Sequence, residues 1–178
     1  TKMYGPSVMP PQPDGIWQTV YNGGNWVESK GEDKYRKGVY TYLKRTSPYP
    51  SFLTFDAGSR EVSTVRRTVT NTPLQALVTL NDPVYLETAY HLAKIMRQGK
   101  NVDSSIREGY KKAVLSDISE EKLSALKELY NSSLSDFQEK PNNVKEFIPF
   151  ETDTDANLAA LTVVANAIMN LDEFLTKS

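Results

Sequence analysis

Two closely spaced helix starts, at Thr72-Pro73 and Asp82-Pro83, constrain the fold of this chain more than any other feature. Thr72 is typical of an N-cap, and Pro73 suits the first position of a helix. Gln75 follows the cap by three residues, which is the spacing of a capping box. Asp82 and Pro83 repeat the cap and proline. We therefore expect a sharp turn between two helices that begin at Pro73 and Pro83.

Helical periodicity continues after this turn. Apolar residues recur at helical spacing from Tyr85 to Met96, and the pattern ends near Gly99. The region from 155 to 175 is apolar on nearly every side, which predicts a helix packed centrally in a bundle. Three further elements are expected: a helix after Asp103 or Ser104, a helix capped by Ser119 and closed by Pro141, and a short helical turn at 143–148.

The first 58 residues have a different composition, with 7 of the 9 glycines and 6 of the 10 prolines. Such a segment favours turns over helices. It also holds 10 of the 18 aromatic residues, so it must bury rings against other parts of the chain. Residues 39–43 alternate β-branched and aromatic side chains, which predicts a short strand, although no partner strand is evident.

The predicted fold is therefore mainly α: a bundle of about five helices with an irregular, aromatic-rich N-terminal arm. We assign residues 1–60 to the arm and 61–178 to the bundle, within a single domain that is a fragment of a larger multidomain protein. The arm is expected to dock on the bundle.

Composition excludes several classes of function. Lys and Arg number 21 against 22 Asp and Glu, so no net field attracts nucleic acid or an anionic membrane. The chain has no cysteine, which excludes disulfides, thiolate metal sites and haem attachment through Cys-x-x-Cys-His within this segment. No apolar run approaches the roughly 20 residues of a membrane span.

Polar side chains are densest around the two helix starts. A planar guanidinium suits a carboxylate, so Asp56 or Asp82 paired with an arginine could clamp the arm to the bundle. The alternative is that an arginine stays free to bind an anionic or polyhydroxylated ligand. The candidate ligand-binding residues here are Arg66, Arg67, Asn71, Gln75, Asn81 and Asp82, with Asp56 and Arg60 just upstream.

The arm supplies a second set of candidate ligand contacts. Trp17 and Trp26, together with Tyr21, Tyr35 and Tyr49, could present flat faces to sugar rings. The other interpretation is that these aromatics only anchor the arm.

Three further motifs favour structural roles. Residues 153–157 have the Asp-x-Asp-x-Asn spacing with which a calcium-binding loop begins, but the later positions of the loop lack the required glycine and glutamate. Asp155 is therefore interpreted as part of a helix cap. His91 is the only histidine and is interpreted as a partly exposed, non-catalytic residue. Thr162, Asn166, Asn170 and Glu173 form a polar line on the last helix, interpreted as an interhelical hydrogen-bond seam or a solvent-facing edge. We expect no catalytic residue and no metal site.

Five blocks of sequence, in the same order, resemble a known family. They are residues 4–17, 35–46, 55–57, 66–83 and 170–174. The chain is similar to the C-terminal part of the planctomycete cytochrome-c-associated domain of unknown function 1553. Gly58-Ser59-Arg60 and Ser63 depart from the family pattern.

The resemblance implies an exported, periplasmic bacterial protein whose upstream domains, the partners of this segment, include a c-type cytochrome module. The export signal and the haem c are then expected elsewhere in the polypeptide, with no cofactor in this segment. The resemblance implies no established activity, and we interpret the chain as a non-catalytic structural or interaction module. The alternative is a carbohydrate-binding or carbohydrate-processing domain, with a polysaccharide as its ligand.

Overall fold

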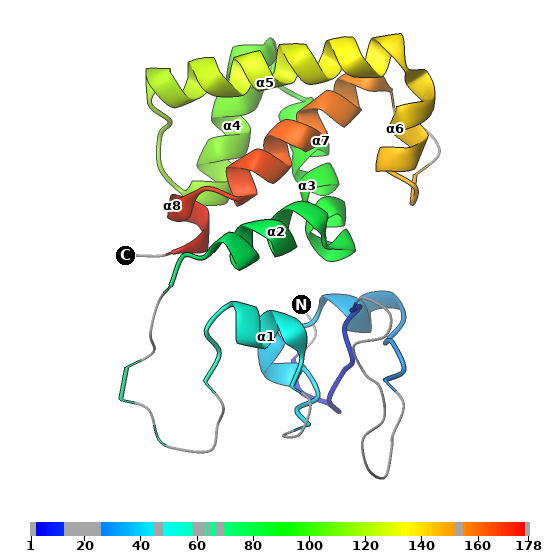
Figure 1. The fold of residues 1–178 in the computed structure, drawn as a ribbon, viewed down its shortest axis with the longest axis vertical. Coiled ribbons are helices and arrows are strands. Elements are labelled where there is room, and N and C mark those ends of the chain that lie inside the picture. Colours follow the sequence, from blue (N-terminus) through cyan, green and yellow to red (C-terminus); the bar gives the residue numbers. More distant parts are fainter. Residues whose placement is uncertain are drawn as a thin grey trace. The chain divides into compact units, whose positions relative to one another are not determined.

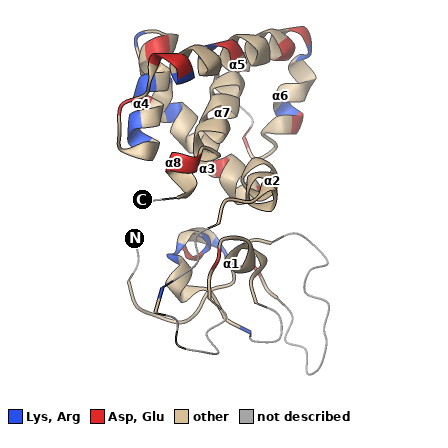
Figure 2. Ribbon diagram, turned by 60° about the vertical axis from the view of Figure 1, so that its left-hand side comes forward, with Lys and Arg blue, Asp and Glu red and all other residues tan. Residues whose placement is uncertain are grey.

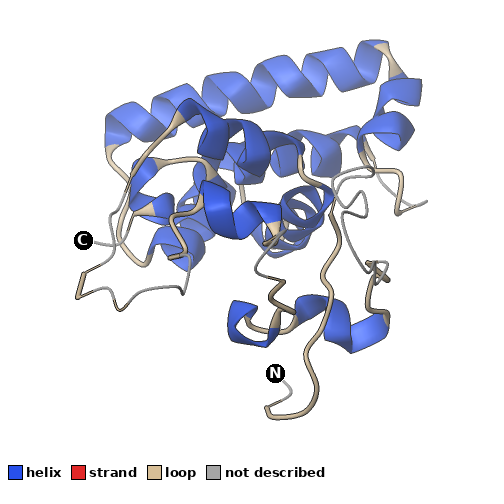
Figure 3. Ribbon diagram, turned by 60° about the horizontal axis from the view of Figure 1, so that its bottom comes forward, coloured by secondary structure: helices blue, strands red, loops and turns tan. Residues whose placement is uncertain are grey.

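The computed structural model describes residues 3–12, 26–44, 48–58, 63, 65–66, 70–151 and 155–176. Within these ranges it contains eight α-helices, two 3-10 helices and no β-strand (Figures 1 and 3). The prediction of a mainly α-helical fold is therefore confirmed. The chain divides into two compact units, Thr1–Gln75 and Ala76–Ser178. That the two units form one domain, and that the arm docks, remain predictions.

The first unit contains the arm. Its regular elements are η1 (Gly31–Tyr35), η2 (Gly38–Tyr40), α1 (Pro50–Thr54) and the first turn of α2 (Pro73–Asn81). Helices η1, η2 and α1 contain no buried residue, whereas the first turn of α2 contains the buried Gln75. Contacts made by individual side chains therefore hold the arm together.

The strand predicted at residues 39–43 is wrong. Val39 and Tyr40 belong to η2, and only Thr41 forms an isolated parallel bridge, with Val8. The amide of Val8 donates to the Tyr40 carbonyl and the Tyr42 amide donates to the Val8 carbonyl, both at 2.8 Å. The ladder cannot extend along the Val8 segment because Pro10 and Pro11 have no N–H to donate.

The second unit is the helical bundle. After α2 it continues through α3 (Pro83–Met96), α4 (Val102–Val114), α5 (Glu120–Glu139), α6 (Pro141–Phe147), α7 (Ala156–Met169) and α8 (Asp172–Leu175). No helix in the described part of the chain is both long and apolar enough to cross a membrane.

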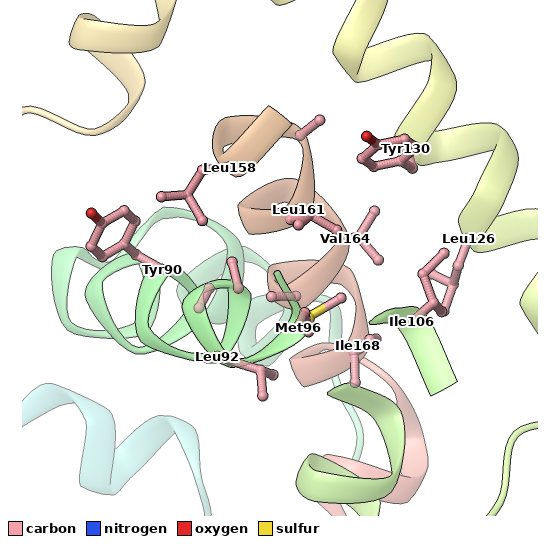
Figure 4. Close-up of a cluster of buried hydrophobic side chains, with 14 of the residues drawn as sticks. Tyr90, Leu92, Met96, Ile106, Leu126, Tyr130, Leu158, Leu161, Val164 and Ile168 are labelled. Atoms are coloured by element: carbon pink, nitrogen blue, oxygen red, sulfur yellow. The ribbon is translucent and has the colours of Figure 1, made fainter. Parts of the chain in front are cut away.

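Helix α7 lies at the centre of the bundle, as predicted. It packs against α3, α4 and α5, and ten of its residues are buried (Figure 1). It carries no charged side chain, whereas α4 and α5 carry many (Figure 2). Leu161, Val164 and Ile168 of α7 meet Met96 of α3 and Ile106 of α4 in the core (Figure 4).

Three helix boundaries differ from the predicted ones. The short helical turn predicted at 143–148 is helix α6, which begins at Pro141 because proline suits the first position of a helix. Helix α4 begins at Val102 because Asn101 is the cap and Ser104 is the third residue of a capping box. The side chain of Asn101 accepts from the Ser104 amide at 2.8 Å, and the Asn101 amide donates to Ser104 Oγ at 3.0 Å. The last predicted helix is divided after Asn170 into α7 and α8, because the backbone of Leu171 is extended, with φ of −74° and ψ of 148°. The bundle thus has more helices than the expected five.

Candidate functional site

The polar cluster predicted around the helix starts contains a compact hydrogen-bonded node in the first unit. Asp56 has a positive φ of 55°, which places its carboxylate beside Thr70. Asp56 Oδ2 accepts from the Thr70 amide at 2.8 Å and from Thr70 Oγ1 at 2.7 Å. This carboxylate therefore closes a loop between two positions fourteen residues apart in the first unit.

Gln75 is the centre of this node and is only 2% exposed. Its Oε1 accepts from the Thr72 amide at 3.1 Å, and its own amide donates to Thr72 Oγ1 at 3.3 Å. The predicted capping box is therefore present. Gln75 Nε2 also donates to the Thr54 carbonyl at 2.9 Å and to Thr70 Oγ1 at 3.2 Å, so one side chain ties the start of α2 to the end of α1.

Asp82 and Asn81 lie at the next helix junction, in the second unit. Asp82 Oδ1 accepts from the Val84 amide at 2.8 Å and caps α3, as predicted. Burial raises the pKa of Asp82 above its usual value, and hydrogen bonds from the backbone amides of Val84 and Tyr85 oppose that rise. Asn81 donates to the Leu77 carbonyl at 2.8 Å. Both side chains therefore shape the turn.

The predicted arginine clamp is not formed by Arg66. Its side chain is exposed and makes no ion pair with any residue that the structure describes. The carboxylate of Asp56 instead accepts a hydrogen bond from Thr70, and that of Asp82 accepts one from a backbone amide. Both carboxylates therefore already have hydrogen-bond donors. Asn71 is exposed. Arg67, Arg60 and Trp17 lie outside the described residues.

Trp26 is a structural anchor of the arm. Its Nε1 donates to the Pro10 carbonyl at 3.0 Å, and its ring stacks on Tyr49 at 5.7 Å between centroids, with 10° between planes. Tyr49 is buried, and its hydroxyl donates to the Pro11 carbonyl at 2.7 Å. One face of the indole is therefore covered by an aromatic ring. Tyr35 is exposed, and Tyr21 lies outside the described residues.

Arg36 is a further anchor of the arm, and it was not predicted from the sequence. It is 9% exposed, with its guanidinium 3.8 Å from the centroid of the Tyr40 ring. Its Nη1 donates to the Pro6 carbonyl at 2.8 Å and its Nη2 to the Tyr4 carbonyl at 2.6 Å. The available signal was an arginine among the aromatic residues of a glycine- and proline-rich arm.

The polar line on the last helix is partly the predicted seam. Thr79 of α2 is fully buried and donates to Asn170 Oδ1 at 2.8 Å. Thr162 donates to the Leu158 carbonyl of its own helix at 2.7 Å. Asn166 Oδ1 is buried with no hydrogen-bond partner among the described residues. Glu173 instead forms an ion pair with Lys122, which lowers the pKa of Glu173 and raises that of Lys122.

Asp155 and His91 take the expected places. Asp155 caps α7 by accepting from the Leu158 amide at 2.7 Å, while Asp153 lies outside the described residues. His91 is exposed on α3. No group of three or more His, Asp or Glu side chains that could hold a metal occurs among the residues with described positions.

These observations describe a mainly α-helical protein in which most of the described candidate residues shape turns and helix ends. The chain belongs to the PSD1 family of proteins of unknown function (DUF1553), whose family model matches residues 1–130. No curated protein and no solved structure matches the chain.

Proposed function

We propose that this chain is a non-catalytic interaction module that packs against upstream domains of the same polypeptide. The proposed setting is an exported, cytochrome-c-linked bacterial protein, as the five blocks of family-like sequence suggest. The packing surface is the leucine face of α2, defined as Leu77 and Leu80 of the second unit.

The observation that supports this proposal is the exposure of that face. Leu77 and Leu80 are 58% and 48% exposed, and they lie three residues apart on one side of a helix. Apolar side chains gathered in this way are typical of interaction surfaces. The neighbouring polar side chains of Gln75, Asn81 and Asp82 are engaged in hydrogen bonds, so they offer a ligand few unused groups.

The test compares this segment with the full-length polypeptide by hydrogen–deuterium exchange. We expect the α2 amides to exchange at least tenfold more slowly in the full-length protein, because a packed helix opens less often. Leu77→Ser combined with Leu80→Ser should remove this protection. Val39→Ser is the matched control, since Val39 is 73% exposed and lies outside α2. Equal exchange of α2 in both proteins would contradict the proposal.

The carbohydrate-binding alternative has its own test. Trp26 uses one ring face for Tyr49 and its N–H for Pro10, so a sugar would need the other face. Titration with hydroxyethyl cellulose, followed by tryptophan fluorescence, should leave the spectrum unchanged under our proposal. A saturable change that Trp26→Phe removes would favour the alternative.

A further inference from the structure

We propose that a small cavity in the helical bundle, bordered by the α3–α4 turn, α5 and α7, binds a small oxyanion, either a carboxylate or a phosphate group. The cavity has a volume of about 200 Å³. Its polar walls are formed by Arg97, Lys100, Asn101, Ser105, Tyr130 and Asn157.

Two hydroxyl groups in this cavity have no other use. Ser105 and Tyr130 are 5% and 4% exposed, and neither hydroxyl makes a hydrogen bond within the described residues. Neither oxygen is among the fully buried, unpartnered side-chain atoms of the described residues, so both hydroxyls keep some accessible surface and can donate to a ligand that enters the cavity. Figure 4 shows the Tyr130 ring reaching from α5 toward α7, with its hydroxyl at the α7 side.

The charge of the lining favours an anion. Lys100 is exposed and forms no ion pair within the described ranges, whereas Arg97 is held at 2.7 Å by Asp155. The lining residues themselves include two cations and no carboxylate. The cavity also adjoins the first turns of α4 and α7, whose amides carry partial positive charge.

The turn is built to leave this space open. A Cβ placed on Gly99 would lie 2.5 Å from Ser105 Oγ and 2.7 Å from the Ser105 amide nitrogen. Only glycine therefore lets the turn pass so close to α4. Burial and the nearby Asp155 carboxylate raise the pKa of Tyr130, so this hydroxyl remains a donor at neutral pH.

A larger hollow of about 490 Å³ lies beside α8, but it is less suited to a ligand. Its charged lining residues are Asp172 and Glu173, and Glu173 is already paired with Lys122. None of its lining residues is a buried polar group.

The experiment is a calorimetric titration of the whole chain with inorganic phosphate and, separately, with acetate. We expect saturable one-to-one binding of at least one anion. Tyr130→Phe removes one donor without changing ring packing and should weaken binding roughly tenfold, the usual cost of a lost hydrogen bond to a charged group. Lys100→Ala should weaken binding and reduce its salt dependence.

Two control variants separate the cavity from general effects. Tyr90→Phe removes the hydroxyl of another buried tyrosine, 3% exposed, which does not line the cavity. Lys112→Ala removes an exposed charge elsewhere on α4. Both should bind the anion as the parent does. Preference for phosphate indicates a phosphate ester as ligand, and preference for acetate indicates a carboxylate.

The proposal is overturned if neither anion binds saturably below about 10 mM, a concentration at which even a millimolar site would be occupied. It is also overturned if Tyr130→Phe and Lys100→Ala bind as tightly as the controls. Thermal melting of each variant without ligand checks that all four remain folded.

Discussion

Gln75 shows how much structure one buried side chain can organise. Its amide group accepts from the Thr72 backbone and donates to Thr54 and Thr70, so the capping box is also a tertiary anchor. The sequence spacing predicted the box, because both partners lie within one turn. It could not predict the bond to the Thr54 carbonyl, which depends on the path of the intervening chain.

We expect Gln75→Ala to lower the free energy of unfolding of the first unit by about 1–3 kcal/mol, because it leaves buried partners unpaired. Urea unfolding followed by tryptophan fluorescence reports on this unit, since both tryptophans belong to it. Gln98→Ala, at an exposed position after α3, is the control. An unchanged midpoint for Gln75→Ala would show that the node contributes no stability.

Asp82 provides a pH-dependent test at the start of α3. Its pKa is raised in the folded state, so its charged form opposes folding: its stabilising contribution is complete below about pH 3.8 and is lost as pH rises through the folded pKa. Asp82→Asn keeps a good cap without the charge. We therefore expect this variant to gain stability relative to the parent as pH rises from 3 to 7.

The matching variant Asp82→Ala removes the cap itself and should cost about 0.5–2 kcal/mol at pH 7. Both variants are measured by urea unfolding with far-ultraviolet circular dichroism. If Asp82→Ala unfolds at the midpoint of the parent at every pH, the side chain of Asp82 has no role as a cap.

At the scale of elements, the packing of α3 against α4 depends on a glycine inside a helix. Gly109 is buried, and a Cβ there would lie 2.5 Å from Met96 Cγ and 2.6 Å from Met96 Sδ. Helical periodicity predicted α4 without explaining this glycine, because the reason lies on another helix. The same limit applies to Arg36, whose partners are backbone carbonyls thirty or more residues away.

Gly109→Ala should therefore lower stability by about 1–3 kcal/mol through overpacking, even though alanine favours a helix by nearly 1 kcal/mol. The measurement is the urea midpoint by circular dichroism. Gly58→Ala is the control, since a Cβ at Gly58 meets no atom within 4 Å. In a double mutant with Met96→Ala, the two losses should be less than additive; strict additivity would contradict the contact.

At the scale of the whole molecule, the sequence predicted the bundle well and the arm poorly. The apolar run from Leu158 to Ile168 identified the central helix, because a helix that is buried on every side has apolar residues all around it. The arm has no periodic hydrophobic pattern in its sequence, since the hydrogen bonds of Arg36 and the ring stacking of Trp26 hold it together. The cavity near Tyr130 was also beyond prediction, because its lining comes from separate helices.

The buried core extends beyond the residues that the family model matches, which decides which part of the chain can fold alone. The family model ends at Tyr130, within α5, yet the core continues through α7 to Met169. A chain ending at Tyr130 would expose Met96 and Ile106, which are fully buried against that core. We expect residues 1–130 to lack a cooperative helical transition, because too little apolar surface is buried without α7.

Residues 76–178, in contrast, should retain strong helical circular dichroism and unfold in one cooperative step, because they contain the whole cluster of buried core residues around α7. A chain ending at residue 171 is the matched control for truncation: it loses α8, with the partly buried Phe174, and the exposed ion pair between Lys122 and Glu173, but it keeps all the buried residues of the core cluster. Cooperative unfolding of residues 1–130 would instead show that the family-matched part has a core of its own, and that α7 is an addition to it.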